Sequence, residues 1–177
     1  MGIRDHSQIV LVVVGVILLG INIFLIVENV RLKAEVEQSK LMVTEEGYKF
    51  SELKMRGLDG SEETIDFSDG KYKTILLVFN TTCKYCLQEY PYWKELAENV
   101  DPNRWRIVAV TSEDNMNKIK NHVEEYKLDN IKVASVAQTD LRGARMLFTP
   151  MTLVIGTDGE VKKVWPGLWK KGFELPE

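Results

Sequence analysis

The sequence predicts a membrane-spanning helix followed by one α/β domain, in which a central mixed β-sheet is flanked by helices. Three observations lead to this prediction: an uncharged apolar N-terminal stretch, an alternation of β-branched apolar runs with segments of helical spacing, and a hairpin pattern near the C-terminus. Such an alternation is typical of a sheet covered by helices on its faces. We expect four parts, namely a tail (1–8), a transmembrane anchor (9–27), a stalk (28–43) and the α/β domain (44–177).

Charge and cysteine content exclude several functions. The chain has 177 residues and a formal net charge of -3, which leaves no basic surface for nucleic acid. Its two cysteines are too few for a disulfide-stapled scaffold or for a closed zinc site. We therefore expect no nucleic-acid partner, no metal and no cofactor.

The predicted anchor, Ile9 to Val27, contains 19 residues without a charge. At about 1.5 Å per residue, a helix of this length spans most of a bilayer core of ~30 Å. No small-residue cleavage site follows Val27, which favours an uncleaved anchor over a cleaved signal peptide. A buried core helix is the alternative, and the apolar surface on all sides of this stretch disfavours it. Residues 28–42 favour a helix and include both positive and negative side chains, which is typical of a solvent-exposed stalk.

The domain begins with a predicted hairpin, formed by Lys54–Leu58 and Thr64–Phe67 around a glycine-containing turn. Thr74–Phe79 is a continuous apolar run, which predicts a central strand buried on both faces. Cys83 to about Glu98 has helical spacing, although Pro91 must remove one backbone hydrogen bond within it.

The second half of the domain continues the alternation. Trp105–Thr111 predicts a second buried strand and Ile131–Val136 a third, and between them Ser112–Asp114 offer caps for a helix. Asp140 is expected to cap a short helix. The last two predicted strands pair as a hairpin and comprise Met151–Ile155 and Val161–Trp165.

Cys83 and Cys86 are the candidate reactive residues. Residues three apart in a helix share one face with Cβ atoms about 5–6 Å apart, which permits reversible closure of a disulfide. If the helix begins directly after the preceding strand, Cys83 lies at its N-terminus, where free N–H groups favour a thiolate and Lys84 adds a positive charge. Cys83 is then the attacking nucleophile, and Cys86 is the resolving thiol of a thiol-disulfide oxidoreductase.

Two cysteines at this spacing also occur in zinc sites, peroxidases and structural disulfides. A second ligand pair for zinc is missing, because His6 lies near the membrane and His122 is expected on the exposed surface of a helix. A peroxidatic cysteine would have Thr three residues before it, where Asn80 stands. A structural disulfide across two residues constrains the unfolded chain little. These comparisons favour a redox-active pair.

From about Phe50 to Trp169 the chain resembles the membrane-anchored thioredoxin-like proteins of the TlpA and ResA type, within the AhpC/TSA and Redoxin-related superfamily. The resemblance rests on four motifs in fixed order, TILLVF, FNTTCKYC, CLQEYP and FTPMTLVIGTDGEV. It implies a thioredoxin-like fold and a cis peptide bond at Pro150, which lies 64 residues beyond Cys86. An ordinary strand-edge proline is the alternative for Pro150.

The resemblance implies that substrate binds around the cysteines. Thr149 and Pro150 would pair with an extended substrate peptide, and Lys84 and Tyr85, between the two cysteines, would contact it.

The resemblance also implies that Glu89 helps to move protons at the resolving cysteine, with a solvated helix residue as the alternative. Two positions depart from the family pattern. Thr82 stands where most relatives carry Trp, and Leu77 stands where thioredoxin has a buried Asp, so the substrate surface and the proton path are expected to differ.

We therefore expect an enzyme that reduces or exchanges disulfides in proteins. The family implies protein substrates with disulfides or thiols, a membrane thiol-electron donor and a role in cytochrome c maturation. A net disulfide oxidant is one alternative, and a non-catalytic binding or copper-handling module is another.

Charge and chemistry point to different orientations in the membrane. Arg4 precedes the span, whereas Arg31, Lys33 and Lys40 follow it, and this bias favours a cytoplasmic domain. Exchange with substrate disulfides fits an oxidising compartment instead. We expect a single-pass protein of the cell membrane, with its catalytic domain at the periplasmic or outer face.

Overall fold

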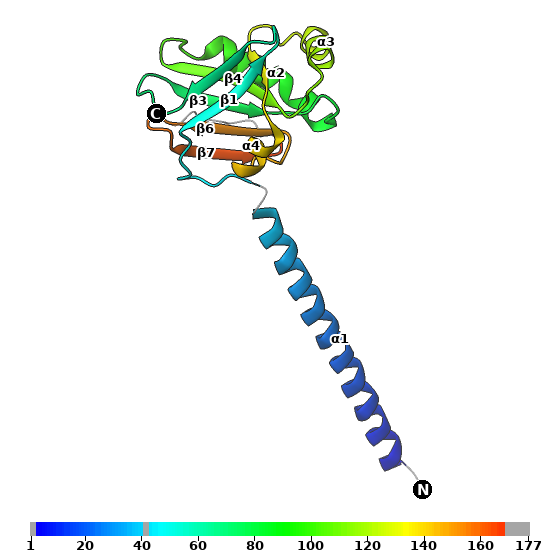
Figure 1. The fold of residues 1–177 in the computed structure, drawn as a ribbon. Helices are drawn as coiled ribbons and strands as arrows, with labels where there is room; N and C mark the ends of the chain where they lie inside the picture. Colours follow the sequence, from blue (N-terminus) through cyan, green and yellow to red (C-terminus); the bar gives the residue numbers. More distant parts are fainter. Residues whose placement is uncertain (1–2, 41–42, 169–177) are drawn as a thin grey trace. The chain divides into compact units, whose positions relative to one another are not determined.

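The computed structural model describes residues 3–40 and 43–168 (Figure 1). These residues form two compact units, an N-terminal helix and the domain that follows it, and each is described by itself.

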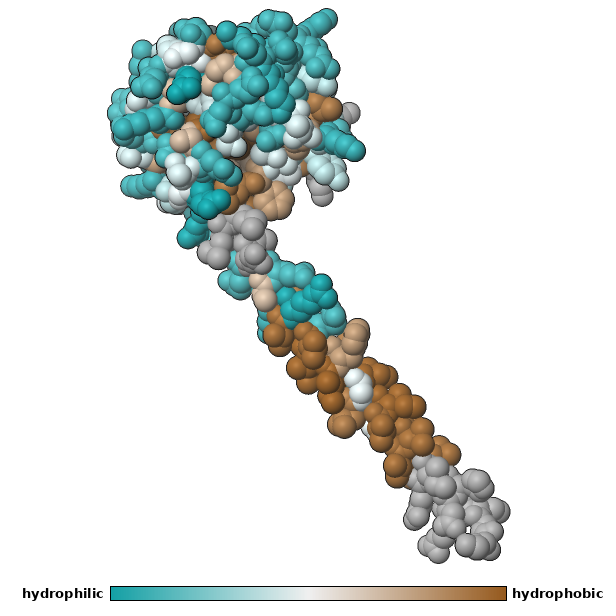
Figure 2. Space-filling view, turned by 45° about the vertical axis from the view of Figure 1, so that its right-hand side comes forward, coloured by the Kyte–Doolittle hydropathy of each residue, from teal (hydrophilic) through white to brown (hydrophobic). Residues whose placement is uncertain are grey.

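Helix α1 runs from Ile3 to Lys40. Its side chains from Val10 to Val27 are exposed and nearly all apolar, and Figure 2 shows that this apolar surface gives way to polar side chains farther along the helix. Within the described residues, one helix is long and apolar enough to cross a membrane, over Val10–Glu37. The amide of Asn22 donates a hydrogen bond to the Leu18 carbonyl at 2.8 Å, so this polar group is satisfied inside its own helix. The boundaries between tail, anchor and stalk stay a prediction.

Seven strands of the described chain form one mixed sheet in the order β2-β1-β5-β4-β3-β6-β7. The central neighbours β3, β4 and β5 are parallel, and the other pairs are antiparallel. The predicted mixed sheet is confirmed, and each strand lies within two residues of its predicted bounds. The strands are β1 (Glu52–Gly57), β2 (Glu62–Asp66), β3 (Lys73–Val78), β4 (Trp105–Thr111), β5 (Lys132–Ser135), β6 (Met151–Ile155) and β7 (Val161–Pro166).

In the described part of the domain, three helices accompany the sheet: α2 (Lys84–Asn99), α3 (Met116–Tyr126) and α4 (Gln138–Gly143). Two predicted caps are wrong. The side chain of Asn115, one residue beyond the predicted segment, caps α3 by accepting a hydrogen bond from the Lys118 N–H. Helix α4 begins earlier than predicted, so Asp140 lies in its first turn, where a negative charge still suits the helix dipole.

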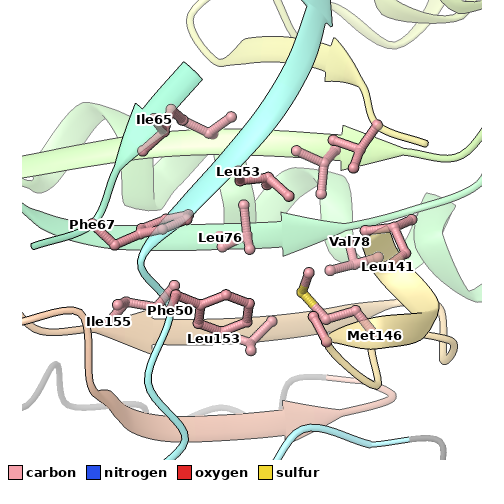
Figure 3. Close-up of a cluster of buried hydrophobic side chains, with 14 of the residues drawn as sticks. Phe50, Leu53, Ile65, Phe67, Leu76, Val78, Leu141, Met146, Leu153 and Ile155 are labelled. Atoms are coloured by element: carbon pink, nitrogen blue, oxygen red, sulfur yellow. The ribbon is translucent and has the colours of Figure 1, made fainter. Parts of the chain in front are cut away.

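Strand β3 is buried on both faces, as predicted for a central strand. Leu76 and Val78 belong to a cluster that Figure 3 shows on one face of the sheet, together with Phe50 and Leu141 of α4. The alternate side chains of β3 belong to a second cluster, formed with α2 and α3: Ile75 and Leu77. Because β3 is packed on both faces, its C-terminal end is a firm base for the loop that carries the cysteines.

Candidate active site

A tight turn connects β3 to α2 and places Cys83 at the start of the helix. The side-chain oxygen of Asn80 accepts hydrogen bonds from the N–H of Thr82 at 2.9 Å and from its hydroxyl at 2.6 Å. The Cys83 N–H donates to the Asn80 carbonyl at 3.0 Å, which closes the turn. Cys83 is the N-cap residue of α2, and its sulfur accepts a hydrogen bond from the Cys86 N–H at 3.3 Å.

The environment of Cys83 favours its thiolate. Its side chain is half-buried, and its Sγ lies 3.4 Å from the Thr149 carbonyl oxygen. Burial opposes ionisation, but it is outweighed by hydrogen bonds from the side chains of Cys86 and Thr149 and from the N–H groups of Cys86 and Tyr85, so the pKa of Cys83 is lowered. A partly accessible sulfur with a lowered pKa is the kind of thiol that attacks a disulfide.

Cys86 has the opposite character. It is fully buried, one helical turn from Cys83, and both cysteines are thiols in this structure. Burial, and then the neighbouring sulfur of Cys83, raise the pKa of Cys86 to about 12. The two thiols therefore differ both in access and in acidity.

The loop before β6 completes the surroundings of the sulfurs. The Thr149–Pro150 peptide bond is cis, and Thr149 is the residue whose carbonyl and side chain face the cysteines. This contact joins residues 66 positions apart in the chain, and the antiparallel pairing of β6 with β3 brings them together.

A cavity of about 490 Å³ opens beside Cys83. Lys84, Tyr85 and Leu147 are among the residues that line it, and all three are exposed. Phe148, the residue before Thr149, is also an exposed apolar side chain. The complete lining is Val78, Phe79, Asn80, Thr82, Cys83, Lys84, Tyr85, Ser112, Leu141, Met146, Leu147 and Thr149.

Glu89 lies on α2, three residues after Cys86, and only 1% of its surface is exposed. The alternative of a solvated helix residue is therefore wrong. Residues three apart in a helix share one face, so Glu89 and Cys86 lie on the same side of α2, and a buried carboxyl group on that side is suited to exchanging a proton with the thiol.

His122 is buried, and its predicted exposure is wrong. Its Nε2 lies 2.6 Å from the Tyr90 hydroxyl, and its ring stacks on Phe79. Burial lowers the pKa of His122, which favours the neutral ring. His122 follows Ile119 by three residues, so it continues the apolar stripe of α3, and this spacing was the signal for a buried ring.

The described residues bring together no group of three or more His, Cys, Asp or Glu side chains with the geometry of a metal site. The reactive groups of this site are two thiols and a buried carboxyl group, and the loop at Thr149 faces the thiols.

A family model described as Redoxin matches residues 45–170. The chain belongs to the Redoxin family. This Redoxin-family chain is a thiol-disulfide oxidoreductase of the thioredoxin type, in agreement with the paired thiols at the start of α2. A search of curated proteins returned no match.

Solved structures show the thioredoxin-like fold of this Redoxin-family domain. The thioredoxin domain of a thiol-disulfide oxidoreductase from Bacteroides vulgatus has a TM-score of 0.60 at 15% identity, over 69% of this chain and 89% of that one. StoA from Bacillus subtilis has a TM-score of 0.55 at 21% identity, over 66% and 87%. A peroxiredoxin-like protein from Aquifex aeolicus has a TM-score of 0.58 at 17% identity, over 69% and 75%. These likenesses show the predicted fold.

Proposed function

We propose that this chain is a membrane-anchored enzyme that reduces or exchanges disulfides of extracytoplasmic proteins, with Cys83 as nucleophile and Cys86 as resolving thiol. One observation carries the proposal. The accessible sulfur at the start of α2 has a lowered pKa, whereas the sulfur one turn later is buried and has a raised pKa. The first thiol is thus ready to attack, and the second is kept protonated until it is needed.

The reaction proceeds in two exchanges. The Cys83 thiolate attacks one sulfur of a substrate disulfide, the substrate S–S bond breaks, and the departing substrate thiolate takes up a proton. Cys86 then gives its proton to Glu89 and attacks the Cys83 sulfur, forming the Cys83–Cys86 disulfide and releasing the second substrate thiolate. Two electrons have passed to the substrate, and the enzyme ends the reaction in its oxidised, disulfide form.

Polypeptides fit this site as substrates. Tyr85 and Leu147, which line the cavity beside Cys83, expose apolar surface, as does Phe148 next to Thr149. Such surface favours a partner with apolar side chains next to its cysteine. The backbone at Thr149 and Pro150 lies beside the reactive sulfur, where an extended peptide can pair with it. Lys84 and Tyr85 complete the contact surface.

The N-terminal helix supports the membrane assignment. Its length and composition suit a single span, and disulfide exchange suits the periplasmic or outer face. In this setting a membrane thiol transporter supplies electrons to the Cys83–Cys86 disulfide, and the cysteines of apocytochrome c are candidate substrates.

A trapping experiment tests the mechanism. In a Cys86→Ser variant the mixed disulfide on Cys83 cannot be resolved, so substrate proteins are expected to remain attached in membranes and to be released by dithiothreitol. The matched control, Cys83→Ser, should trap nothing and should lose insulin-disulfide reduction. Equal trapping by both variants, or unchanged insulin reduction by Cys83→Ser, would contradict the proposal and leave a binding or copper-handling module.

Net oxidation of substrate thiols is a second candidate, favoured by the lowered pKa of Cys83. A stabilised thiolate makes the reduced enzyme more stable and the disulfide form more oxidising. The redox state of the pair in growing cells separates the two directions. A reductase is held mostly as the dithiol, whereas an oxidant is held mostly as the disulfide.

A further inference from the structure

Thr81, in the turn before Cys83, is tied to a carboxylate from a neighbouring loop. Its hydroxyl donates a hydrogen bond to Oε2 of Glu113, which lies between β4 and α3. Strands β3 and β4 are parallel neighbours, so the loops that follow them leave the sheet at the same edge. The contact therefore joins the cysteine turn to the loop beside it.

Glu113 is itself held from several sides. Lys118 of α3 contacts its Oε1 at 2.5 Å, and Ser135 at the end of β5 donates to its backbone carbonyl at 2.7 Å. Its own N–H donates to the Thr111 hydroxyl at 3.3 Å. Burial opposes ionisation of Glu113, but the hydrogen bonds from Lys118 and Thr81 outweigh it and lower its pKa. Glu113 is thus a fixed, charged acceptor.

The turn that Glu113 holds sets the position of the reactive sulfur. Asn80 braces the turn from within, by accepting from Thr82 and from the Cys83 N–H. The Cys83 sulfur accepts a hydrogen bond from the Cys86 N–H at 3.3 Å, so the stabilisation of its thiolate depends on where the turn places the sulfur.

We propose that Glu113 is a positioning residue for Cys83: through Thr81 it holds the turn so that the sulfur stays within reach of the N–H groups of α2. The proposal rests on the proposed function, in which Cys83 is the attacking thiol. It predicts that the acidity of Cys83 depends on the hydrogen bond between Thr81 and Glu113 rather than on the negative charge of Glu113.

Removal of the Glu113 carboxylate should shift the pKa of Cys83 in one direction if Glu113 acts by holding the turn, and in the opposite direction if it acts through its charge. Removing a negative charge and leaving Lys118 unbalanced would lower the pKa of Cys83. Releasing the turn would raise it, because the thiolate would lose hydrogen bonds. Thr81→Val removes the hydroxyl while keeping charge and shape, and Glu113→Gln removes the charge while keeping an acceptor. Glu113→Ala removes both.

The test is the pH profile of Cys83 alkylation by iodoacetamide, measured on the full chain in detergent with Cys86→Ser as background. Thr81→Val and Glu113→Ala are expected to raise the pKa of Cys83 by about half a unit, which slows alkylation about threefold below the pKa. Glu113→Gln is expected not to raise it, and Thr81→Ser, which keeps the hydroxyl, is expected to restore the parent profile.

Two results would overturn the proposal. One is a Thr81→Val profile that superimposes on the parent, even if thermal unfolding shows lower stability, since the contact would then be structural only. The other is a lowered pKa in Glu113→Ala, which would mark a pure charge effect. The proposed function is judged separately, by substrate trapping in the parent Cys86→Ser chain.

Discussion

Burial of Cys86 predicts that the reduced protein loses stability at alkaline pH. In the folded state the pKa of Cys86 is about 12, whereas in an unfolded chain the thiol loses its proton near its ordinary pKa of 9.0. Between these two values the folded state binds more protons than the unfolded state, so the free energy of unfolding falls as pH rises. The slope is about 1.4 kcal/mol for each pH unit over this window, and it vanishes below pH 9.

Urea unfolding of the full-length reduced protein in detergent, followed by tryptophan fluorescence, to which the buried Trp93 contributes, measures this slope. Lysines and tyrosines titrate in the same window, so Cys86→Ala is the control. Its free energy of unfolding should fall less steeply with pH than that of the parent, and the two slopes should differ by about 1.4 kcal/mol for each pH unit. The oxidised protein should behave like Cys86→Ala, because its sulfurs carry no titrating proton. Equal slopes in the reduced parent and in Cys86→Ala would refute the reasoning.

Three further predictions concern neighbours of the cysteines. Thr149→Val removes a side chain that hydrogen-bonds to both sulfurs, so it should raise the pKa of Cys83. Alkylation of Cys83 by iodoacetamide at pH 6 should then slow by about threefold to tenfold, and an unchanged pH profile would contradict this. His122→Leu should lower the free energy of unfolding in urea by about 1–3 kcal/mol, because it leaves the buried Tyr90 hydroxyl without its hydrogen-bond partner. Adding Tyr90→Phe should recover part of this loss, whereas strictly additive effects of the two substitutions would argue against the interaction. Glu89→Gln removes the group that takes the Cys86 proton, so it should slow decay of the mixed disulfide in stopped-flow measurements by roughly 10²-fold and leave the alkylation of Cys83 unchanged. An unchanged decay rate would show that Glu89 has no part in the mechanism.

The amino-acid pattern predicted correctly those features that depend on residues close together in the chain. The run from Thr74 to Phe79 is apolar at every position but the first, and β3 is accordingly buried on both faces. The spacing of Cys83 and Cys86 directly after this strand placed them at a helix start, which depends only on short-range geometry. Capping was less predictable, because Asn115 and its neighbours offer equivalent side chains within a few residues.

Long-range neighbours had no comparable signal. The spacing of His122 after Ile119 indicated a buried ring, but its hydrogen-bond partner, Tyr90 of α2, lies 32 residues away in the chain and had no signal in the sequence. The fixing of Thr81 by Glu113 likewise depends on two loops that only the parallel pairing of β3 with β4 brings together.

The amino-acid sequence alone determined the succession of strands and helices, the apolar N-terminal helix and the position of the cysteine pair, because each follows from periodicity and spacing within one segment. Only the tertiary structure decided how the two thiols differ. Packing of α2 and α3 on the sheet buries Cys86, and the pairing of β6 with β3 brings Thr149 to Cys83. The acidity of each sulfur depends on these contacts, and residues far apart in the chain supply them.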